Sequence, residues 1–408
     1  MKAPKSFRLH IGIFGRRNTG KSSLLNILTG QEVSIVSNIA GTTTDPVEKP
    51  MEFLPLGPVL FIDTAGIDDL GDLGEKRVKK TMAVLDRTDL AIIVSNFAEW
   101  GEYEHQLIAE FKKRALPFVV VFNKIDCFKE NTALTSQFDS AKIAYVFTST
   151  TTGEGIPELR QLLLQQAPTD FINRPAILSD LVGPGEMAVL VIPIDKEAPK
   201  GRLILPQVQS IRDLLDNNSF CVVVKESELS EALSRFNKPP KLVVTDSQAF
   251  LKVAADTPKD IPLTSFSILF ARFQADLIEM VRGAMTIGQL KPGDKVLIAE
   301  ACSHHPVEED IGTVKIPRWL TQYVGGKLQI DNIRGHDFPK NISEYKIIIH
   351  CGACMWNRRE MLTRIMKAHQ AGVAITNYGL AIAYLLGIFE RALQPFPAAL
   401  DVFMSHKD

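Results

Sequence analysis

The sequence predicts an α/β protein of three units, which we place at residues 1–170, 172–265 and 266–408. In each unit, short apolar runs typical of buried strands alternate with helical stretches, and this alternation indicates a parallel sheet. The chain has 408 residues, of which 45% are hydrophobic, so it is long enough for several cores. In an open parallel sheet the carboxyl ends of the strands face one side, where ligands bind. Residues that directly follow an apolar run are therefore the candidates for function.

Composition argues against several other classes of protein. The start, Met1 to Ser6, lacks the apolar core and small-residue cleavage site of a signal peptide, so we expect a cytoplasmic protein. Five cysteines, an odd number in a long chain, indicate reduced thiols. The net charge of -1 gives no global signal for nucleic acid, and we expect no nucleic-acid partner. The longest apolar stretch, Ala371 to Phe389, is interrupted by Thr376 to Gly379, so we expect strand, turn and helix there and no membrane span.

The first unit opens with an apolar strand, Arg8 to Phe14, followed by the glycine-rich segment Gly15 to Ser22 and a helical stretch. Gly-Arg-Arg-Asn-Thr-Gly-Lys-Ser between a strand and a helix is a P-loop in its usual context. Its glycines let backbone N–H groups surround phosphate oxygens, Lys21 reaches the outer phosphates, and the Ser22 hydroxyl binds magnesium. The expected nucleotide-binding residues of this segment are Gly15, Asn18, Thr19, Gly20, Lys21, Ser22 and Ser23.

The residues after a second predicted strand are expected to contact the magnesium ion and the γ-phosphate. Asp63-Thr64-Ala65-Gly66 follows the strand Val59 to Ile62. This position places the Asp63 carboxylate beside the magnesium and the Gly66 amide beside the γ-phosphate.

A third strand end selects the base. Asn123-Lys124-Ile125-Asp126 follows the strand Pro117 to Phe122. The Asp126 carboxylate can accept hydrogen bonds from both N1–H and the 2-amino group of guanine, and adenine has neither donor there. The expected nucleotide is therefore GTP. Ser149 and Thr150 follow the strand-like Ile143 to Phe147, in a loop that can complete the base pocket.

Gly41-Thr42-Thr43-Thr44-Asp45 resembles the first switch of the GTPases related to Era and to the tRNA-modifying enzyme TrmE. The resemblance assigns the magnesium ligand to Thr43, with Thr42 as the alternative. Ile67 stands where Ras-like enzymes have a glutamine that orients water, so we expect slow hydrolysis. In these relatives an asparagine that matches Asn18 often holds a potassium ion; the alternative is that Asn18 is a turn residue. The residues expected to act in catalysis are Lys21, Thr43, Asp63 and Gly66.

The middle unit, after a linker at Pro168 to Pro175, alternates apolar runs with helical stretches and contains no catalytic constellation. We interpret it as an interaction module that uses an edge strand or an apolar helix face. Cys221, and Cys127 in the first unit, are interpreted as structural. The expected strands are Met187 to Ile192, Cys221 to Val224 and Leu242 to Val244, and the expected helices are Gln207 to Leu215, Glu226 to Arg235 and Ser247 to Ala255.

The third unit carries cysteines at the ends of two predicted strands. Cys302 follows the run Lys295 to Ala299, and His350-Cys351-Gly352-Ala353-Cys354 follows Tyr345 to Ile349. The other expected elements are strands at Leu328 to Ile330 and Val373 to Ile375, and helices at Phe266 to Ala284 and Arg358 to His369.

Three thiolates with one open position suit an iron–sulfur cluster. A structural zinc site with one histidine is the first alternative. A dithiol redox site at Cys351 and Cys354, at the start of a helix, is the second. Unrelated buried thiols are the third. The residues expected at the metal are Cys302, Cys351 and Cys354, and the candidates for a fourth ligand are His304, His350, Glu300, Glu308, Glu309 or an exogenous group.

The whole chain resembles the HydF family, the maturation GTPases of FeFe hydrogenases, which join an Era/TrmE-like GTPase to Cys-x-His and His-Cys-x-x-Cys motifs. Here these motifs read Cys302-Ser303-His304 and His350 to Cys354. The resemblance implies a scaffold that carries a 4Fe-4S cluster, receives a diiron precursor from radical-SAM maturases and delivers it to apo-hydrogenase. It also implies a homodimer formed through the middle unit. The alternative function is a tRNA- or ribosome-linked GTPase with a structural zinc domain.

Overall fold

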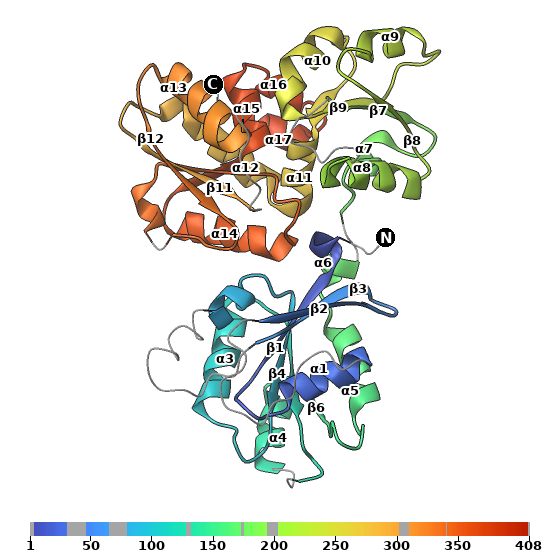
Figure 1. Ribbon diagram of the computed structural model, residues 1–408, viewed down its shortest axis with the longest axis vertical. Coiled ribbons are helices and arrows are strands. Elements are labelled where there is room, and N and C mark those ends of the chain that lie inside the picture. The colour runs from blue at the N-terminus through green and yellow to red at the C-terminus, as the bar shows by residue number, and fades with distance from the viewer. Residues whose placement is uncertain are drawn as a thin grey trace. The chain divides into compact units, whose positions relative to one another are not determined.

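The computed structural model describes residues 4–30, 46–64, 80–127, 132–172, 175–193, 203–301, 310–339 and 341–406. The chain forms two compact units, Met1–Arg174 and Pro175–Asp408 (Figure 1). The second unit contains two separate parallel sheets. The predicted α/β class, with an N-terminal unit of P-loop type followed by parallel-sheet domains, is confirmed.

The first unit is a six-stranded sheet with the strand order β2-β3-β1-β4-β5-β6, in which only β2 is antiparallel to its neighbour. Helices α1 and α5 pack on one face of the sheet, and α3 and α4 pack on the other. The strands are β1 (Leu9–Phe14), β2 (Val47–Phe53), β3 (Gly57–Asp63), β4 (Leu90–Ser95), β5 (Phe118–Phe122) and β6 (Tyr145–Phe147). The helices are α1 (Lys21–Thr29), α3 (Glu102–Lys113), α4 (Thr132–Ser140), α5 (Ile156–Gln166) and α6 (Thr169–Ile172).

Two strands of this sheet, β2 and β4, have no counterpart among the predicted strands. Strand β2 alternates half-exposed and exposed positions because it lies at the edge of the sheet, where only one side is covered. Strand β4 is buried along its whole length, and its apolar run from Leu90 to Val94 is a signal that the sequence does contain.

The first sheet of the second unit has the order β10-β9-β7-β8, and all of its pairs are parallel. Its strands are β7 (Met187–Val191), β8 (Phe220–Val224), β9 (Leu242–Thr245) and β10 (Leu263–Ser265). Its helices are α7 (Ser179–Val182), α8 (Leu205–Asp216), α9 (Leu229–Ser234) and α10 (Phe250–Asp256).

The other sheet of this unit has the order β12-β11-β13-β14, again all parallel. Helices α13 and α15 pack on one face, while α12 lies against β14 so closely that a Cβ on Gly283 would be 1.9 Å from the Ile375 carbonyl oxygen. The strands are β11 (Lys295–Glu300), β12 (Gln329–Arg334), β13 (Ile347–His350) and β14 (Ala374–Asn377). The helices are α11 (Phe266–Gln274), α12 (Leu277–Met285), α13 (Ile316–Val324), α14 (Arg358–Gln370), α15 (Tyr378–Leu385), α16 (Phe389–Leu393) and α17 (Pro397–Met404).

The single helix predicted over Phe266 to Ala284 is wrong, because the structure has two helices, α11 and α12, in that range. The side chain of Asp276 accepts the amide of Glu279 at 3.1 Å and so begins the second helix. The Arg358 guanidinium donates to the carbonyls of Phe273 and Ala275, at 2.9 and 2.7 Å, and so closes the first.

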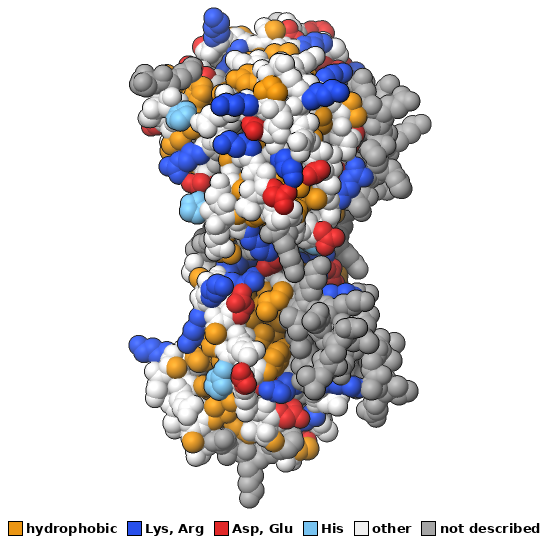
Figure 2. Space-filling model, turned by 90° about the vertical axis from the view of Figure 1, so that its left-hand side faces the viewer, with side chains coloured by type: hydrophobic (Ala, Val, Ile, Leu, Met, Phe, Trp, Pro, Cys, Tyr) orange, Lys and Arg blue, Asp and Glu red, His pale blue; other side chains and the backbone are white. Residues whose placement is uncertain are grey.

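The stretch from Ala371 to Phe389 forms β14, α15 and the start of α16, so the predicted strand and helix are present. The turn predicted at Thr376 to Gly379 is wrong, because β14 runs to Asn377 and α15 begins at Tyr378, with the Asn377 side chain accepting the Leu380 amide at 3.0 Å as N-cap. No helix in the described part of the chain is long and apolar enough to cross a membrane. On the face shown in Figure 2, basic and acidic side chains of the described residues are interspersed.

Candidate functional site

The P-loop connects β1 to α1, and its backbone packs too closely to its neighbours for side chains at two positions. A Cβ on Gly15 would lie 2.1 Å from the Val94 carbonyl oxygen, and one on Gly20 would lie 2.2 Å from Asn123 Nδ2. Both glycines have positive φ angles, 149° and 94°. Lys21 Nζ donates to the carbonyl oxygens of Gly15 and Arg16 at 2.9 and 2.5 Å, so its ammonium lies inside the loop. The Lys21 ammonium therefore lies inside the loop that binds the phosphates.

The magnesium side of the site joins the start of α1 to the end of β3. Ser22 Oγ donates to Asp63 Oδ2 at 2.7 Å. The other carboxylate oxygen, Asp63 Oδ1, is buried and has no hydrogen-bond partner among the described residues. Burial raises the pKa of Asp63, and the Ser22 hydroxyl and the Lys21 charge oppose that rise. A hydroxyl next to a buried carboxylate with an unused oxygen fits a magnesium ion and its water.

Asn123 connects the base loops to the P-loop. Its side chain is 1% exposed and donates from Nδ2 to the Thr19 carbonyl at 3.0 Å. Its Oδ1 accepts the Thr148 hydroxyl at 3.2 Å and the Thr150 amide at 3.3 Å. Three loops that are distant in the sequence are therefore fixed by one buried amide group.

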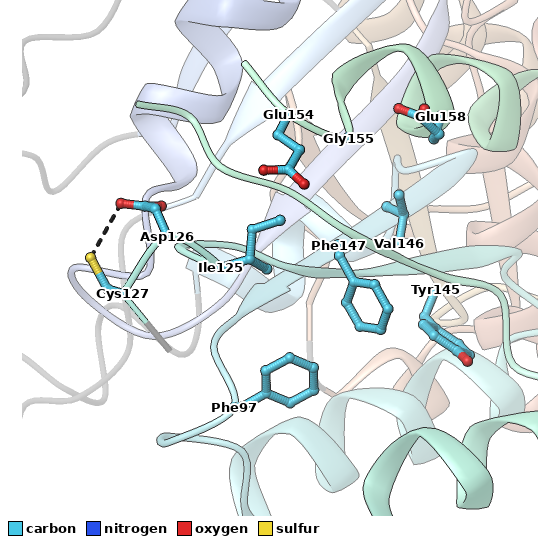
Figure 3. Close-up of a pocket in the computed structure, with 10 residues that line it drawn as sticks. All are labelled: Phe97, Ile125, Asp126, Cys127, Tyr145, Val146, Phe147, Glu154, Gly155 and Glu158. Atoms are coloured by element: carbon cyan, nitrogen blue, oxygen red, sulfur yellow. Dashed lines mark hydrogen bonds between the residues drawn. The ribbon is translucent and has the colours of Figure 1, made fainter. Parts of the chain in front are cut away.

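Asp126, the residue predicted to select guanine, is exposed and available to a ligand. Hydrogen bonds from the Ser149 hydroxyl and then from Cys127 hold the pKa of Asp126 below its ordinary value. The carboxylate is thus kept ionised as an acceptor. It lies at the edge of a pocket of about 820 Å³ that is also lined by Phe97, Phe147 and Glu154 (Figure 3).

The structural role predicted for Cys127 is wrong. The side chain is exposed, and Sγ donates to Asp126 Oδ2 at 3.2 Å (Figure 3). This bond and the carboxylate charge raise the pKa of the Cys127 thiol. Cys221, by contrast, is half-buried on β8, where burial raises the pKa of its thiol.

One ion pair of this site has no sequence signal, because its members are far apart in the chain. Arg16, in the P-loop, binds both carboxylate oxygens of Glu104 on α3, at 2.9 and 3.2 Å. Glu104 is fully buried and also accepts the Gly101 amide at 2.9 Å. The P-loop is thereby connected to the first turn of α3. Thr43, with its alternative Thr42, and Gly66 and Ile67 lie outside the described residues.

In the second unit, parallel pairing brings the ends of β11 and β13 together. The Cys351 amide donates to the Ala299 carbonyl at 2.9 Å, and Cys351 Sγ accepts the Ala301 amide at 3.1 Å. Ala301 is the residue before Cys302 in the sequence. The thiol of Cys351 therefore lies at the point where the chain enters the other cysteine motif. Cys302, His304, Glu308 and Glu309 lie outside the described residues.

Two candidates for a fourth metal ligand already have hydrogen-bond partners. The ring nitrogens of His350 lie 2.9 Å from the Cys351 carbonyl oxygen and 3.1 Å from Arg364. Burial, and then the Arg364 charge, lower the pKa of His350 to about 3. Glu300 is 3% exposed and accepts the Tyr378 hydroxyl at 3.2 Å and Arg334 Nε at 2.9 Å. Either side chain would have to release a partner in order to bind a metal.

Cys354 does not begin a helix, contrary to the geometry predicted for a dithiol site. It lies in a turn, and α14 begins at Arg358 with Asn357 as its N-cap, which accepts the Glu360 amide at 3.4 Å. The thiol therefore lacks the stabilisation that a helix N-terminus gives to a thiolate. Among the described residues, which do not include Cys302, no group of three His, Cys, Asp or Glu side chains is placed to hold a metal ion.

Comparison with known proteins matches the units to families. Residues 10–124 match the 50S ribosome-binding GTPase family, residues 177–275 the hydrogen maturase F dimerization domain, and residues 278–395 the hydrogen maturase F tetramerization domain. The N-terminal unit is therefore a P-loop GTPase domain, and the chain is a GTPase with further domains. Since those further domains are the two domains of hydrogen maturase F, the chain belongs to the HydF family of GTPase-fused hydrogenase maturases.

Relatives of the GTPase part are also found among curated proteins. The tRNA modification GTPase MnmE of Chromobacterium violaceum is 39% identical over 158 residues, which are 38% of this chain and 34% of that protein. The GTPase Der of Wolinella succinogenes is 36% identical over 193 residues, 42% of this chain and 40% of that protein. The chain thus spans less than half the length of these relatives. A solved structure of Aquifex aeolicus Era is 20% identical, covers 61% of this chain and 99% of its own, and has a TM-score of 0.36.

We expect Asp126→Asn to weaken GTP binding by about 10- to 100-fold, because a charged acceptor for two guanine donors is lost. A carboxamide can donate to the 2-oxo group of xanthine, so xanthosine triphosphate should bind the variant better than it binds the wild type. Competition binding with GTP, ATP and xanthosine triphosphate measures both effects. Equal binding of GTP and ATP by the wild type would contradict the assignment of the base pocket.

Proposed function

We propose that this protein is a GTP-hydrolysing scaffold that binds a 4Fe-4S cluster, assembles the diiron subcluster precursor and delivers it to apo FeFe-hydrogenase. The main support is the contact between Cys351 Sγ and the Ala301 amide, in a domain of the hydrogen maturase F family. This contact places Cys351 next to Ala301, which is the residue before the other cysteine motif in the sequence. Radical-SAM maturases are the proposed source of the precursor.

The proposed hydrolysis depends mainly on positioning and charge, as phosphoryl transfer requires. Lys21 contacts the outer phosphates, Ser22 and Thr43 hold magnesium beside Asp63, and the Gly66 amide contacts the γ-phosphate. Magnesium, when bound, neutralises charge on the phosphate oxygens. Asn18 is exposed on the P-loop with a φ of 60°, a conformation that suits a turn, and its exposed side chain is the one proposed to bind potassium.

The proposed cluster ligands are Cys302, Cys351 and Cys354. The amide that donates to Cys351 Sγ fits this role, because such hydrogen bonds stabilise thiolate ligands. The cluster, when bound, supplies iron with one exchangeable coordination position. His350 and Glu300 already have partners within the protein. The first candidates for that position are therefore His304, Glu308, Glu309 and an exogenous group.

The homodimer is proposed to form through the middle domain, whose family is described as a dimerization domain. Strand β8 is an edge strand of its sheet, and its Phe220 and Val223 are 62% and 45% exposed. On the neighbouring helix α8, Val208 and Leu215 are 44% and 57% exposed. Apolar side chains next to an edge strand are suited to association with a second copy.

Nucleotide state is proposed to regulate the exchange of partners, and not the chemistry of the cluster. The P-loop lies in the first compact unit, whereas Cys351 and Cys354 lie in the second. A P-loop switch rearranges loops when contacts to the γ-phosphate form or break, and such a change can affect an interface without any contact with the metal.

We expect potassium to accelerate GTP hydrolysis on the order of tenfold over sodium, which corresponds to ~1.4 kcal/mol of transition-state stabilisation. Asn18→Ala should remove this difference. The measurement is turnover in matched potassium and sodium buffers. Wild-type protein that hydrolyses GTP equally fast in both buffers would show that Asn18 is only a turn residue.

Anaerobically purified protein should be brown and contain about four iron atoms per chain, as three cysteine ligands and one exchangeable position predict. Replacement of any one of Cys302, Cys351 and Cys354 by alanine should abolish stable binding, and Cys221→Ala serves as the control with a wild-type iron content. Metal analysis and EPR of the reduced protein measure these outcomes. Colourless protein that contains zinc would instead favour a tRNA- or ribosome-linked GTPase with a structural zinc domain.

A further inference from the structure

A buried arginine lies behind the loop that carries Cys351 and Cys354. Arg364, on α14, is 3% exposed. Its NH2 group donates to the carbonyl oxygens of Gly335 and Asp337, at 2.8 and 3.3 Å, just beyond the end of β12. Its NH1 group lies 3.1 Å from His350 Nε2, at the end of β13. One guanidinium thus joins the ends of two strands of the sheet.

The partners of His350 determine its tautomer. An arginine can only donate a hydrogen bond, so His350 Nε2 must accept it. A carbonyl oxygen can only accept, so His350 Nδ1, 2.9 Å from the Cys351 carbonyl, must carry the proton. Both ring nitrogens are then used, and the Nε2 lone pair points to Arg364.

The hydrogen bond from His350 Nδ1 is one of three hydrogen bonds that hold Cys351. Its amide donates to the Ala299 carbonyl at 2.9 Å, its carbonyl accepts His350 Nδ1–H, and its Sγ accepts the Ala301 amide at 3.1 Å. The residue is therefore fixed at its amide, its carbonyl and its thiol. Of these three bonds, the one to His350 depends on a side chain that Arg364 orients.

Arg364 also reaches the side of the loop that carries Cys354. Its guanidinium lies 4.2 Å from the ring centre of Trp356, which is 4% exposed and two residues after Cys354. The Trp356 amide donates to the Ala353 carbonyl at 3.0 Å, and Ala353 has a φ of 50°, a strained conformation for a residue other than glycine. A backbone held in such a conformation needs fixed neighbours, and the ring stacked on Arg364 is one of them.

We propose that Arg364 is a positioning residue that holds Cys351, through His350, and Cys354, through Trp356, at the spacing that a metal cluster requires. This inference rests on the proposed cluster site. In this proposal His350 supports the loop that carries Cys351 and Cys354, and other residues bind the iron. Residues that orient metal ligands without touching the metal commonly change metal affinity by about 10- to 100-fold when they are replaced.

The first test uses protein without a cluster and reads the tautomer of His350. NMR of protein with ¹⁵N-labelled histidine should show, among the eight histidines, a ring with protonated Nδ1 and bare Nε2 whose signal disappears in His350→Gln and is thereby assigned to His350. In Arg364→Lys the ring should lose this single tautomer, because an ammonium lacks the planar fork and the stacking of a guanidinium. An unchanged His350 signal in Arg364→Lys would overturn the proposal.

The second test uses reconstituted full-length protein and measures how fast an iron chelator removes the cluster under anaerobic conditions. Arg364→Lys and Arg364→Gln should lose iron about 10- to 100-fold faster than the wild type and give broadened EPR signals of the reduced cluster. Arg318→Gln, at an exposed position on α13 in the same domain, is the control and should match the wild type. If Arg364→Gln fails to fold, Arg364→Lys and His350→Gln carry the test.

The outcomes separate this inference from the function on which it rests. Wild-type protein that binds no iron would contradict the proposed function, while the NMR test of the His350 tautomer would still stand by itself. Wild-type protein that binds a cluster, with Arg364 variants that retain it equally long and give the same EPR line shape, would overturn the role of Arg364 alone. A nitrogen coupling to the cluster in the wild type that disappears in His350→Gln would overturn it as well.

Discussion

The parallel pairing of β11 with β13 is the constraint on which the candidate cluster site depends. Its register places Ala299 opposite His350, and as a result Cys351 lies next to the residue that precedes Cys302. The two motifs are about fifty residues apart in the sequence, a separation that a crossover connection between parallel strands easily spans. A shift of the register by one residue would turn every side chain of the strand to the opposite face and move Cys351 away from Ala301.

The nucleotide site of the GTPase domain also depends on the pairing of parallel strands. Its phosphate, magnesium and base elements all follow the carboxyl ends of strands β1, β3, β5 and β6. The strands bring these loops close together, and buried polar contacts fix them, such as Asn123 between three loops and Ser22 on Asp63. Because a buried amide must use its donors and acceptors, the loss of any one loop would leave Asn123 unsatisfied.

Much of this arrangement could be predicted from the sequence, because strand ends and glycine-rich loops have local signals. The P-loop, the guanine motif and the strand before Cys351 are examples. Apolar periodicity does not reveal the break between α11 and α12, although Asp276, the N-cap of α12, is a local signal for it. The contacts of Arg358 that close α11 could not be predicted, because Arg358 lies more than eighty residues further along. Similarly, the bonds of Arg16 to Glu104 and of Arg364 to His350 join residues whose proximity arises only in the folded sheet.

In the proposed function nucleotide switching and cluster binding are separate, and Lys21→Ala tests that separation most directly. The Lys21 ammonium lies inside the P-loop, in a different compact unit from Cys351. The measurement compares the iron content and EPR spectrum of the variant with its activation of apo-hydrogenase after loading with the diiron precursor. We expect Lys21→Ala to keep a wild-type cluster and to deliver the diiron precursor poorly. A folded Lys21→Ala protein that has lost its cluster, or a preloaded one that activates apo-hydrogenase at the wild-type rate, would contradict it.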